Sequence, residues 1–292
     1  MFLETIRSEG LAHLSYILGD KGQAAVIDAR RDCDIYQDIA HREGAVITHL
    51  FETHRNEDYV IGSSELARRT GAEIYHGTGL DFAYGHAVDE GDCFRLGDFE
   101  LQVLKTPGHT FESISLLLRD KSFGDTPLVV FTGDALFIGD VGRTDFFPDR
   151  AEEVAGLLHQ SLFEQLLPLG DQTLLYPAHG AGSVCGNRMA SREFSTLGYE
   201  RLHNAALQAD SREAFIARKT SEHHYIPPYF RKMEEYNQYG NAPALPTLPR
   251  PKPMNTEQFA AGIDEGMQIV DVRSPEAFAG ACISDSLAVP LD

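Results

Sequence analysis

The sequence predicts an α/β protein in which two β-sheets are packed between layers of helices, followed by a linker and a small second unit. Three observations favour this architecture. Short apolar runs rich in β-branched and aromatic residues recur up to about residue 180, with helix-like segments between and after them. A proline-rich stretch separates residues 1–240 from residues 254–292. The 292 residues are enough for one large domain and part of another.

Local patterns place the elements of the first unit. Helices are expected at 34–42, 62–70 and 149–167, where a capping residue or turn opens a periodic segment and Gly44, Gly71 or Pro168 follows it. Residues 191–238 are mostly helical in pattern. Strands are expected where short apolar runs lie between turn residues, at 2–7, 14–18, 23–28, 45–52, 72–75, 93–96, 99–105, 114–118, 128–131 and 174–176.

The segment 241–253 is predicted to be a linker, because five prolines in thirteen residues disfavour helix and sheet and favour a stiff, extended chain. Residues 254–292 then show a helix-like segment at 256–263, a strand at 268–272 and a helix start at Ser274-Pro275-Glu276. This stretch is too short to bury a core of its own.

Composition excludes several classes of protein. The formal charge of −19 is spread along the chain, which argues against a nucleic-acid partner. No apolar run is long enough to span a bilayer, and residues 1–4 do not begin a secretory signal. The four cysteines form no C-x-x-C pair, so a disulfide scaffold or structural zinc site is not expected. A reducing cytoplasm is the expected location.

Four predicted strands lead into residues that can bind a metal. The strand at 45–52 leads into Thr53-His54-Arg55-Asn56-Glu57-Asp58-Tyr59, and three later runs end at His109, Asp134 and His179. Alternation along an extended chain is expected to direct His54, Asn56 and Asp58 to one side. A single histidine is more often a solvated or core residue than a ligand, but four such strand ends predict one metal pocket. His54, His109 and Asp134 would supply the two nitrogens and one carboxylate typical of non-haem Fe(II) oxygenases.

Residues 1 to about 240 resemble the metallo-β-lactamase superfamily, whose H-x-H-x-D-H motif falls on residues 54–59. The stretches Thr-Pro-Gly-His-Thr, Thr-Gly-Asp and Pro-Ala-His match its later motifs. Within it, residues 142–146, 182–186 and 228–230 are similar to the persulfide (sulfur) dioxygenases, in particular those fused to rhodanese domains.

The resemblance implies an αββα sandwich holding one Fe(II) per chain on His54, His109 and Asp134, with zinc as the alternative metal. It implies O₂ and a low-molecular-weight persulfide, such as glutathione persulfide, as substrates. Sulfite would be the product, as in sulfur metabolism and hydrogen sulfide detoxification.

Two departures from the motif bear on the reaction, because Asn56 and Tyr59 stand where the superfamily has its second and third histidines. A two-zinc hydrolase needs both positions, whereas the iron branch resembles a single-metal design that uses His54, His109 and Asp134. Two alternatives stay open: a glyoxalase II-like thioester hydrolase with two metals, and a metal-poor, non-catalytic scaffold for a sulfur carrier.

The remaining candidates near the site have more than one interpretation. Asp58 orients a ligand or a water, or is a vestigial surface carboxylate. His179 orients a ligand or contacts the substrate, and together with Asp58 it is a candidate for holding a second metal. Arg143 pairs with Asp145 in a structural role or binds a substrate carboxylate. Cys185 is a small buried residue, or it handles sulfur.

Residues 269–278 resemble the first strand and helix of a rhodanese domain. Cys282 stands where that family has the histidine of Gly-His-Ile, so it is not expected to be the sulfur-transferring nucleophile. Residues 254–292 therefore begin a rhodanese-like unit that should have no sulfurtransferase activity of its own. A rhodanese or another sulfur carrier is a candidate partner, and self-association into a homo-oligomer is left open.

Overall fold

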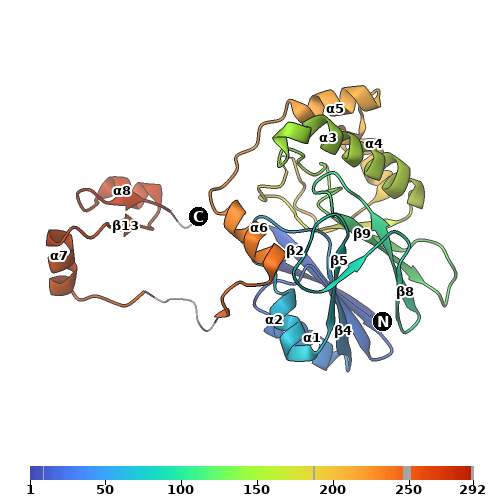
Figure 1. Cartoon of the computed structure of the whole chain (residues 1–292), viewed down its shortest axis with the longest axis horizontal. Helices are drawn as coiled ribbons and strands as arrows, with labels where there is room; N and C mark the ends of the chain where they lie inside the picture. Colours follow the sequence, from blue (N-terminus) through green and yellow to red (C-terminus); the bar gives the residue numbers. More distant parts are fainter. Residues whose placement is uncertain (9, 187, 246–250, 291–292) are drawn as a thin grey trace. The chain divides into compact units, whose positions relative to one another are not determined.

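The computed structural model describes residues 1–8, 10–186, 188–245 and 251–290. The chain divides into two compact units, Met1–Ala242 and Pro243–Asp292 (Figure 1). The division falls within the linker predicted at 241–253, of which residues 246–250 lie outside the described part. None of the described helices combines the length and the apolar character that a bilayer-spanning segment needs.

The first sheet of the larger unit is built from consecutive strands in the order β1-β2-β3-β4-β5-β6. The first three strands pair antiparallel, and β3 to β6 pair in parallel. Helices α1 (Asp34–Arg42) and α2 (Ser63–Thr70) connect the parallel strands β3 to β4 and β4 to β5, as parallel pairing requires. The strands are β1 (Phe2–Ser8), β2 (His13–Asp20), β3 (Gln23–Ile27), β4 (Val46–Glu52), β5 (Glu73–Gly77) and β6 (His86–Val88).

The second sheet has the order β12-β11-β10-β9-β8-β7 and is antiparallel except for the pair β10 and β11. The long connection between those two parallel strands carries several consecutive helical segments. The strands are β7 (Cys93–Leu96), β8 (Phe99–Lys105), β9 (Ile114–Asp120), β10 (Val129–Gly133), β11 (Leu174–Pro177) and β12 (Ser195–Thr196).

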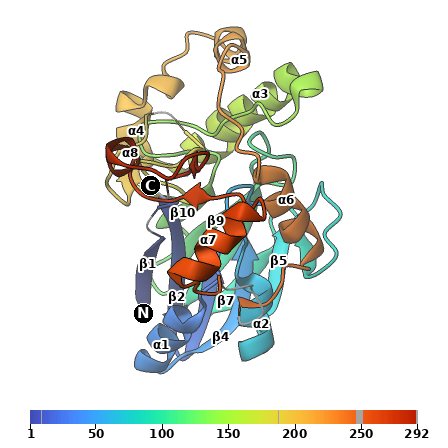
Figure 2. The ribbon, with the colours of Figure 1, turned by 90° about the vertical axis from the view of Figure 1, so that its left-hand side faces the viewer.

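Three apolar cores bind the layers together. The central core lies between the sheets and includes Tyr16, Phe51, Leu101 and Phe131. A second core joins the first sheet to α1 and α2, and a third joins the second sheet to the helices that follow it. Figure 1 shows α1 and α2 on one side of the strands, and the turned view of Figure 2 shows the same separation. On the other side are α3 (Ala151–Gln160), α4 (Leu197–His203) and α5 (Arg212–Thr220). Both sheets are therefore covered on both faces.

The helix predicted at 149–167 changes its hydrogen-bonding pattern along its length. It begins with η1 (Pro148–Arg150) and α3 (Ala151–Gln160), widens into the π-helical turn η2 (Ser161–Leu166), and ends in the 3₁₀ turn η3 (Leu167–Leu169). Pro168 has no N–H for an α-helical bond, so the pattern must change before it. Ser161 Oγ at the start of the wide turn donates to Pro107 O at 2.7 Å.

The region predicted as mostly helical at 191–238 contains four helical segments joined by loops and preceded by β12. Both β12 and β6 are too short for a recognisable alternation of apolar residues. The helical segments are α4 (Leu197–His203), η4 (Ala205–Leu207), α5 (Arg212–Thr220) and α6 (Phe230–Tyr239).

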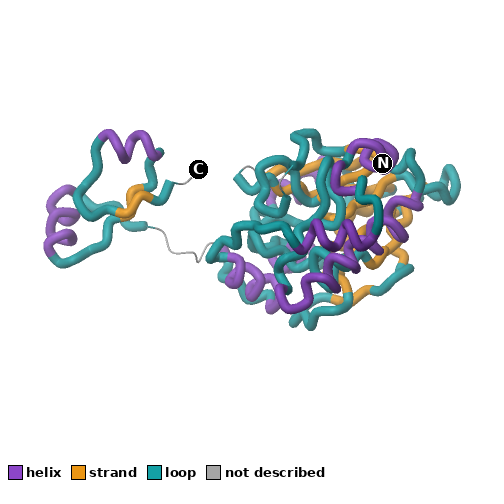
Figure 3. The backbone as a smooth tube through the Cα atoms, turned by 90° about the horizontal axis from the view of Figure 1, so that it is seen from above, coloured by secondary structure: helices purple, strands orange, loops and turns teal. Residues whose placement is uncertain are grey.

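The smaller unit consists of α7 (Thr256–Asp264), β13 (Val270–Asp271), α8 (Pro275–Gly280) and β14 (Leu287–Ala288). Figure 3 shows its helices in purple and its short strand region in orange, and the two strands pair in parallel. Asn255 and Gln258 cap α7 reciprocally. None of the described residues of this unit is fully buried.

Replacing Phe131 by alanine should lower the free energy of unfolding by about 3–5 kcal/mol, because the ring is 1% exposed in the core between the sheets. Phe123→Ala is the matched control, since that ring is 93% exposed, and its effect should stay within about 0.5 kcal/mol. Urea denaturation of both variants measures the difference, and equal losses would contradict the two-sheet core.

Glu52, at the end of β4, should make the free energy of unfolding depend on pH. Burial raises the pKa of this carboxyl to about 8, although Tyr84 donates to both its oxygens at 3.0 and 2.9 Å. The usual carboxyl pKa in the unfolded chain is about 4.3. The contribution of protonated Glu52 to the free energy of unfolding is therefore fully present below that pH, and it is lost as the pH rises towards 8.

Glu52→Gln cannot ionise and keeps the shape of the side chain. The variant should therefore gain stability relative to the unchanged protein between about pH 4 and pH 8, with a constant difference above that range. Denaturation curves at several pH values test this, and a pH-independent difference would show that Glu52 ionises freely.

Candidate metal centre

The candidate ligands lie where strands of the two sheets end side by side. Thr53 and His54 follow β4, while Gly133 ends β10 and Asp134 follows it. Backbone bonds join these ends across the molecule: Ile114 N donates to Thr53 O at 2.8 Å, and Ala178 N donates to Gly133 O at 3.0 Å. The side chains that follow are thus placed by rigid elements of both sheets.

The ring of His54 is fixed by hydrogen bonds that continue into the first sheet. Asp28 accepts from Thr53 N and from Thr53 Oγ1, both at 2.8 Å. Because the Thr53 hydroxyl donates to Asp28, it accepts from Nδ1 of His54 at 2.9 Å. The lone pair of His54 is therefore on Nε2, which is buried without a hydrogen-bond partner among the described residues.

His109 is oriented in the same way by a different group. Its Nδ1 lies 3.0 Å from the backbone carbonyl oxygen of Arg143, which can only accept, so Nδ1 carries the proton. Nε2 of His109 is buried and, within the described chain, has no hydrogen-bond partner. Both imidazoles thus present Nε2 lone pairs to the same point, which is the tautomer a metal needs.

Asp134 completes this arrangement. Its Oδ2 lies 3.8 Å from Nε2 of His54 and 3.5 Å from Nε2 of His109, and no described group hydrogen-bonds to it. Metal–ligand bonds of about 2.0–2.2 Å place neighbouring donor atoms about 3–3.6 Å apart. The distance from Asp134 to His109 lies within this range, and the distance to His54 is slightly longer. Three buried, unpaired donor atoms this close together fit a single divalent cation, so these residues fit the metal that the sequence predicts.

His179 bridges two carboxylates next to this point. Its Nδ1 donates to Asp134 Oδ1 at 2.7 Å, and its Nε2 lies 3.0 Å from Asp58 Oδ2. Burial alone would lower the pKa of His179, but the charges of Asp134 and Asp58 raise it well above its usual value. Burial would likewise raise the pKa of Asp134, yet the histidines, His179 first, hold it well below its usual range.

Glu57 and Cys185 also face the centre. Glu57 is 1% exposed, and its Oε1 lies 3.3 Å from Nε2 of His109 and accepts from Cys185 Sγ at 3.5 Å. Burial raises the pKa of the Cys185 thiol well above its usual value, so the sulfur stays protonated. The structure thus brings Cys185 to the predicted site.

Sequence reasoning missed the orientation of Glu57. Alternation along an extended chain would have pointed it away from His54, but β4 ends at Glu52 and the loop that follows is irregular. Both Glu57 and Asp58 therefore turn inward. An acidic residue next to the motif carboxylate was the available signal.

The two residues that replace motif histidines are buried beside the centre. Asn56 donates from Nδ2 to the carbonyl of His54 at 3.2 Å, while its Oδ1 lacks a partner among the described groups. The ring of Tyr59 packs 4.2 Å from that of His13, a buried residue that sequence reasoning also missed. Asn237 of α6 holds this loop by donating to the carbonyls of Asn56 and Tyr59 at 2.6 and 2.7 Å.

Arg143 is fully buried and joins several segments. Its guanidinium donates to both carboxylate oxygens of Asp145 at 2.7 and 2.8 Å, and to the carbonyls of Val184 and Tyr225 at 3.3 and 3.1 Å. It also lies 4.7 Å from the ring centre of Phe146. These contacts engage the guanidinium within the protein.

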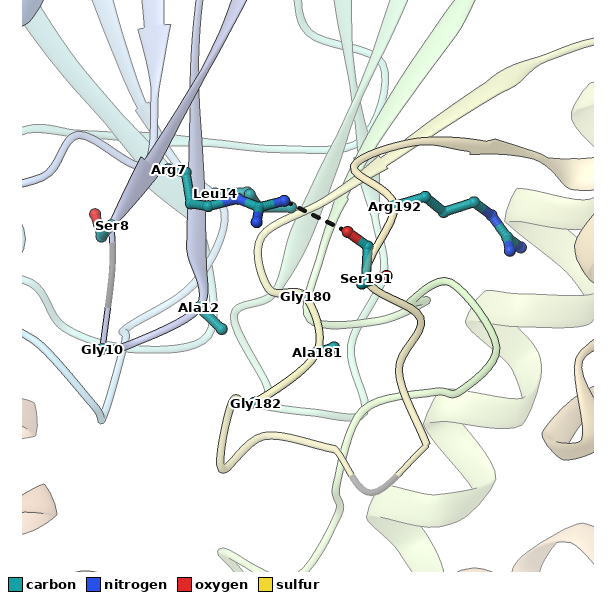
Figure 4. A pocket seen from close by; sticks show the side chains of 10 residues that line it. All are labelled: Arg7, Ser8, Gly10, Ala12, Leu14, Gly180, Ala181, Gly182, Ser191 and Arg192. Atoms are coloured by element: carbon teal, nitrogen blue, oxygen red, sulfur yellow. Dashed lines mark hydrogen bonds between the residues drawn. The ribbon is translucent and has the colours of Figure 1, made fainter. Parts of the chain in front are cut away.

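A pocket of about 280 Å³ lies beside residues 180–182, which follow the last candidate ligand (Figure 4). Its two arginines already have acidic partners, since Arg7 lies 3.0 Å from Glu193 and Arg192 lies 3.3 Å from Glu200. By contrast, a group of buried polar atoms without hydrogen-bond partners among the described residues lies around His54, His109 and Asp134, so a metal is best placed there.

Alanine at position 54, 109 or 134 should abolish tight binding of iron, because each change removes one donor atom from the set. Metal analysis after anaerobic purification measures this. His41→Ala is a suitable control, because His41 is exposed in the last turn of α1. Full iron content in all three site variants would show that these residues are not the metal ligands.

Comparison with known proteins gives two sets of similar enzymes. Persulfide dioxygenase ETHE1 of Homo sapiens is 31% identical over 183 residues, which cover 56% of this chain and 63% of that protein. Hydroxyacylglutathione hydrolase GloC of Haemophilus influenzae is 28% identical over 202 residues, which cover 62% of this chain and 91% of that protein. The chain thus spans less than two thirds of the human relative.

Solved structures agree with this fold along the chain. A metallo-beta-lactamase from Staphylococcus aureus superposes with a TM-score of 0.87 at 32% identity, covering 100% of this chain and 85% of that one. ETHE1 from Myxococcus xanthus gives 0.72 at 30% identity, covering 83% and 100%. The sequence profile of the metallo-beta-lactamase superfamily matches residues 9–179. The predicted α/β sandwich is therefore confirmed, and this chain belongs to the metallo-β-lactamase superfamily.

Proposed function

We propose that this protein is a persulfide dioxygenase that works with one Fe(II) per chain. In the balanced reaction, a persulfide, O₂ and water give a thiol, sulfite and two protons. The observation that carries the proposal is the convergence of His54, His109 and Asp134 with both rings held in the metal-binding tautomer. The similar proteins named persulfide dioxygenase ETHE1 support it.

Bound iron would supply the activation of O₂, which reacts poorly with closed-shell sulfur by itself. The chain's own residues prepare the site for that cofactor. Thr53 and the carbonyl of Arg143 fix the two imidazoles, and the sheet ends hold them in place. His179 lies between Asp134 and Asp58 and holds a proton on Nδ1. It would therefore place a proton donor beside the reacting groups.

The substrate sulfur would meet a protonated thiol as well as carboxylates. Cys185 donates to Glu57, and burial keeps its proton in place. We propose that Cys185 acts here as a hydrogen-bond donor and a wall of the site, because a persulfide anion is stabilised by donors and destabilised by a nearby thiolate.

A thioester hydrolase with two metals is the second candidate. Asp58, His179 and Cys185 offer three buried donor atoms within 4.8 Å of one another, which could hold a second ion beside the first. The similarity to a hydroxyacylglutathione hydrolase points the same way. Against it, Asn56 and Tyr59 replace two ligands that such a centre uses.

We further propose that residues 254–292 begin a rhodanese-like unit, because residues 269–278 resemble the start of that domain. Such a unit would bring a sulfur carrier to the same polypeptide as the oxidation site. Its two short parallel strands and flanking helices are compatible with this proposal.

Anaerobically loaded Fe(II) protein should consume one O₂ and release one sulfite per glutathione persulfide. An oxygen electrode and a sulfite assay measure both quantities. Iron removal should abolish the reaction. Hydrolysis of S-lactoylglutathione under argon by protein with about two metal ions per chain would favour the hydrolase instead. Absence of bound metal and of both activities would favour a scaffold.

A further inference from the structure

We propose that Glu57 is a fourth protein ligand of the metal, so that the centre has two imidazoles and two carboxylates. This inference rests on the metal centre of the proposed function and adds a residue to it. The H-x-H-x-D-H motif leaves this position unspecified, and a carboxylate there stands next to the lost ligand position, Asn56.

The distances place the Glu57 carboxylate on the same point as the other donors. Its Oε1 is 3.3 Å from Nε2 of His109, and its Oε2 is 3.9 Å from Nε2 of His54. These separations match those from Asp134 Oδ2 to the same nitrogens, 3.5 and 3.8 Å. The Glu57 and Asp134 carboxylates thus lie at similar distances from the histidine pair, and one oxygen of each lies within 4.8 Å of the other.

Hydrogen bonding supports a cation between these atoms. Glu57 Oε2, Asp134 Oδ2 and Nε2 of both His54 and His109 are buried and lack hydrogen-bond partners among the described residues. Since both rings carry their proton on Nδ1, the four atoms face one another as lone pairs, which repel. A single added proton would form a hydrogen bond between two of these atoms and leave the other two unpaired. One divalent cation would interact favourably with all four.

The charges balance in the same way. Two buried carboxylates carry two negative charges, and burying them without compensation is unfavourable. One divalent ion makes the set neutral with neutral imidazoles. Cys185 donates to Glu57 Oε1, and Oε2, which has no hydrogen-bond partner among the described residues, faces Nε2 of His54.

A four-residue set changes what the centre can accept. An octahedral ion held by three side chains has three further positions, and a fourth ligand leaves two. Two open coordination positions would accept two small reactants and would leave no position for an additional water. Glu57 would therefore determine how many solvent molecules share the site with substrate.

The test uses metal alone, so it is independent of the reaction. The dissociation constant for Co(II) is measured for the full chain and for Glu57→Gln, with Glu52→Gln as control. Glu52 is equally buried five residues earlier, but its carboxylate accepts from Tyr84. Glu57→Gln should weaken Co(II) binding about tenfold or more, and Glu52→Gln should not. Far-UV circular dichroism of the metal-free variants checks that they fold.

A second readout separates a ligand from a residue that acts through another ligand. Water-proton relaxation of the Mn(II)-loaded protein counts the waters on the ion, and Glu57→Ala should raise this number from about two to about three. An unchanged water number, with or without weaker binding, would overturn the assignment of Glu57 as a ligand. His54→Ala distinguishes the two proposals: if it keeps full Co(II) affinity, the metal centre itself is wrong.

Discussion

The carboxylate of Asp134 is the group around which this site is arranged. A buried negative charge is tolerated only with nearby positive charge or hydrogen-bond donors. Asp134 receives a hydrogen bond from His179 on one oxygen and turns the other towards His54 and His109. Asp134 directly follows strand β10, whose backbone pairs with a neighbour on each side, so its carboxylate is held by a rigid part of the sheet.

Much of the fold follows from local residue patterns. The longer strands and the first two helices have clear periodicity and turn residues, and they lie close to their predicted places. Very short elements such as β6 and β12 carry too few residues for a pattern. The π-helical turn that starts at Ser161 has a hydrogen bond to Pro107, fifty-four residues away, which no local window contains.

The candidate site likewise has residues that the sequence predicts and residues that it does not. His54, His109, Asp134 and His179 come from motif spacing, and the structure places them together. The inward turn of Glu57 could not be predicted, because it arises where a strand ends and regular alternation ceases. The support from Asn237 was equally hidden, since it comes from a helix 178 residues along the chain from Tyr59.

Arg143 has a consequence for motion. Its carbonyl accepts from Nδ1 of His109, while its guanidinium donates to the backbone carbonyls of Val184 and Tyr225, whose side chains are exposed. The outer surface and the candidate metal centre are thus connected through one residue. Displacement of the segments around Val184 and Tyr225 would move Arg143 and so tilt the imidazole of His109.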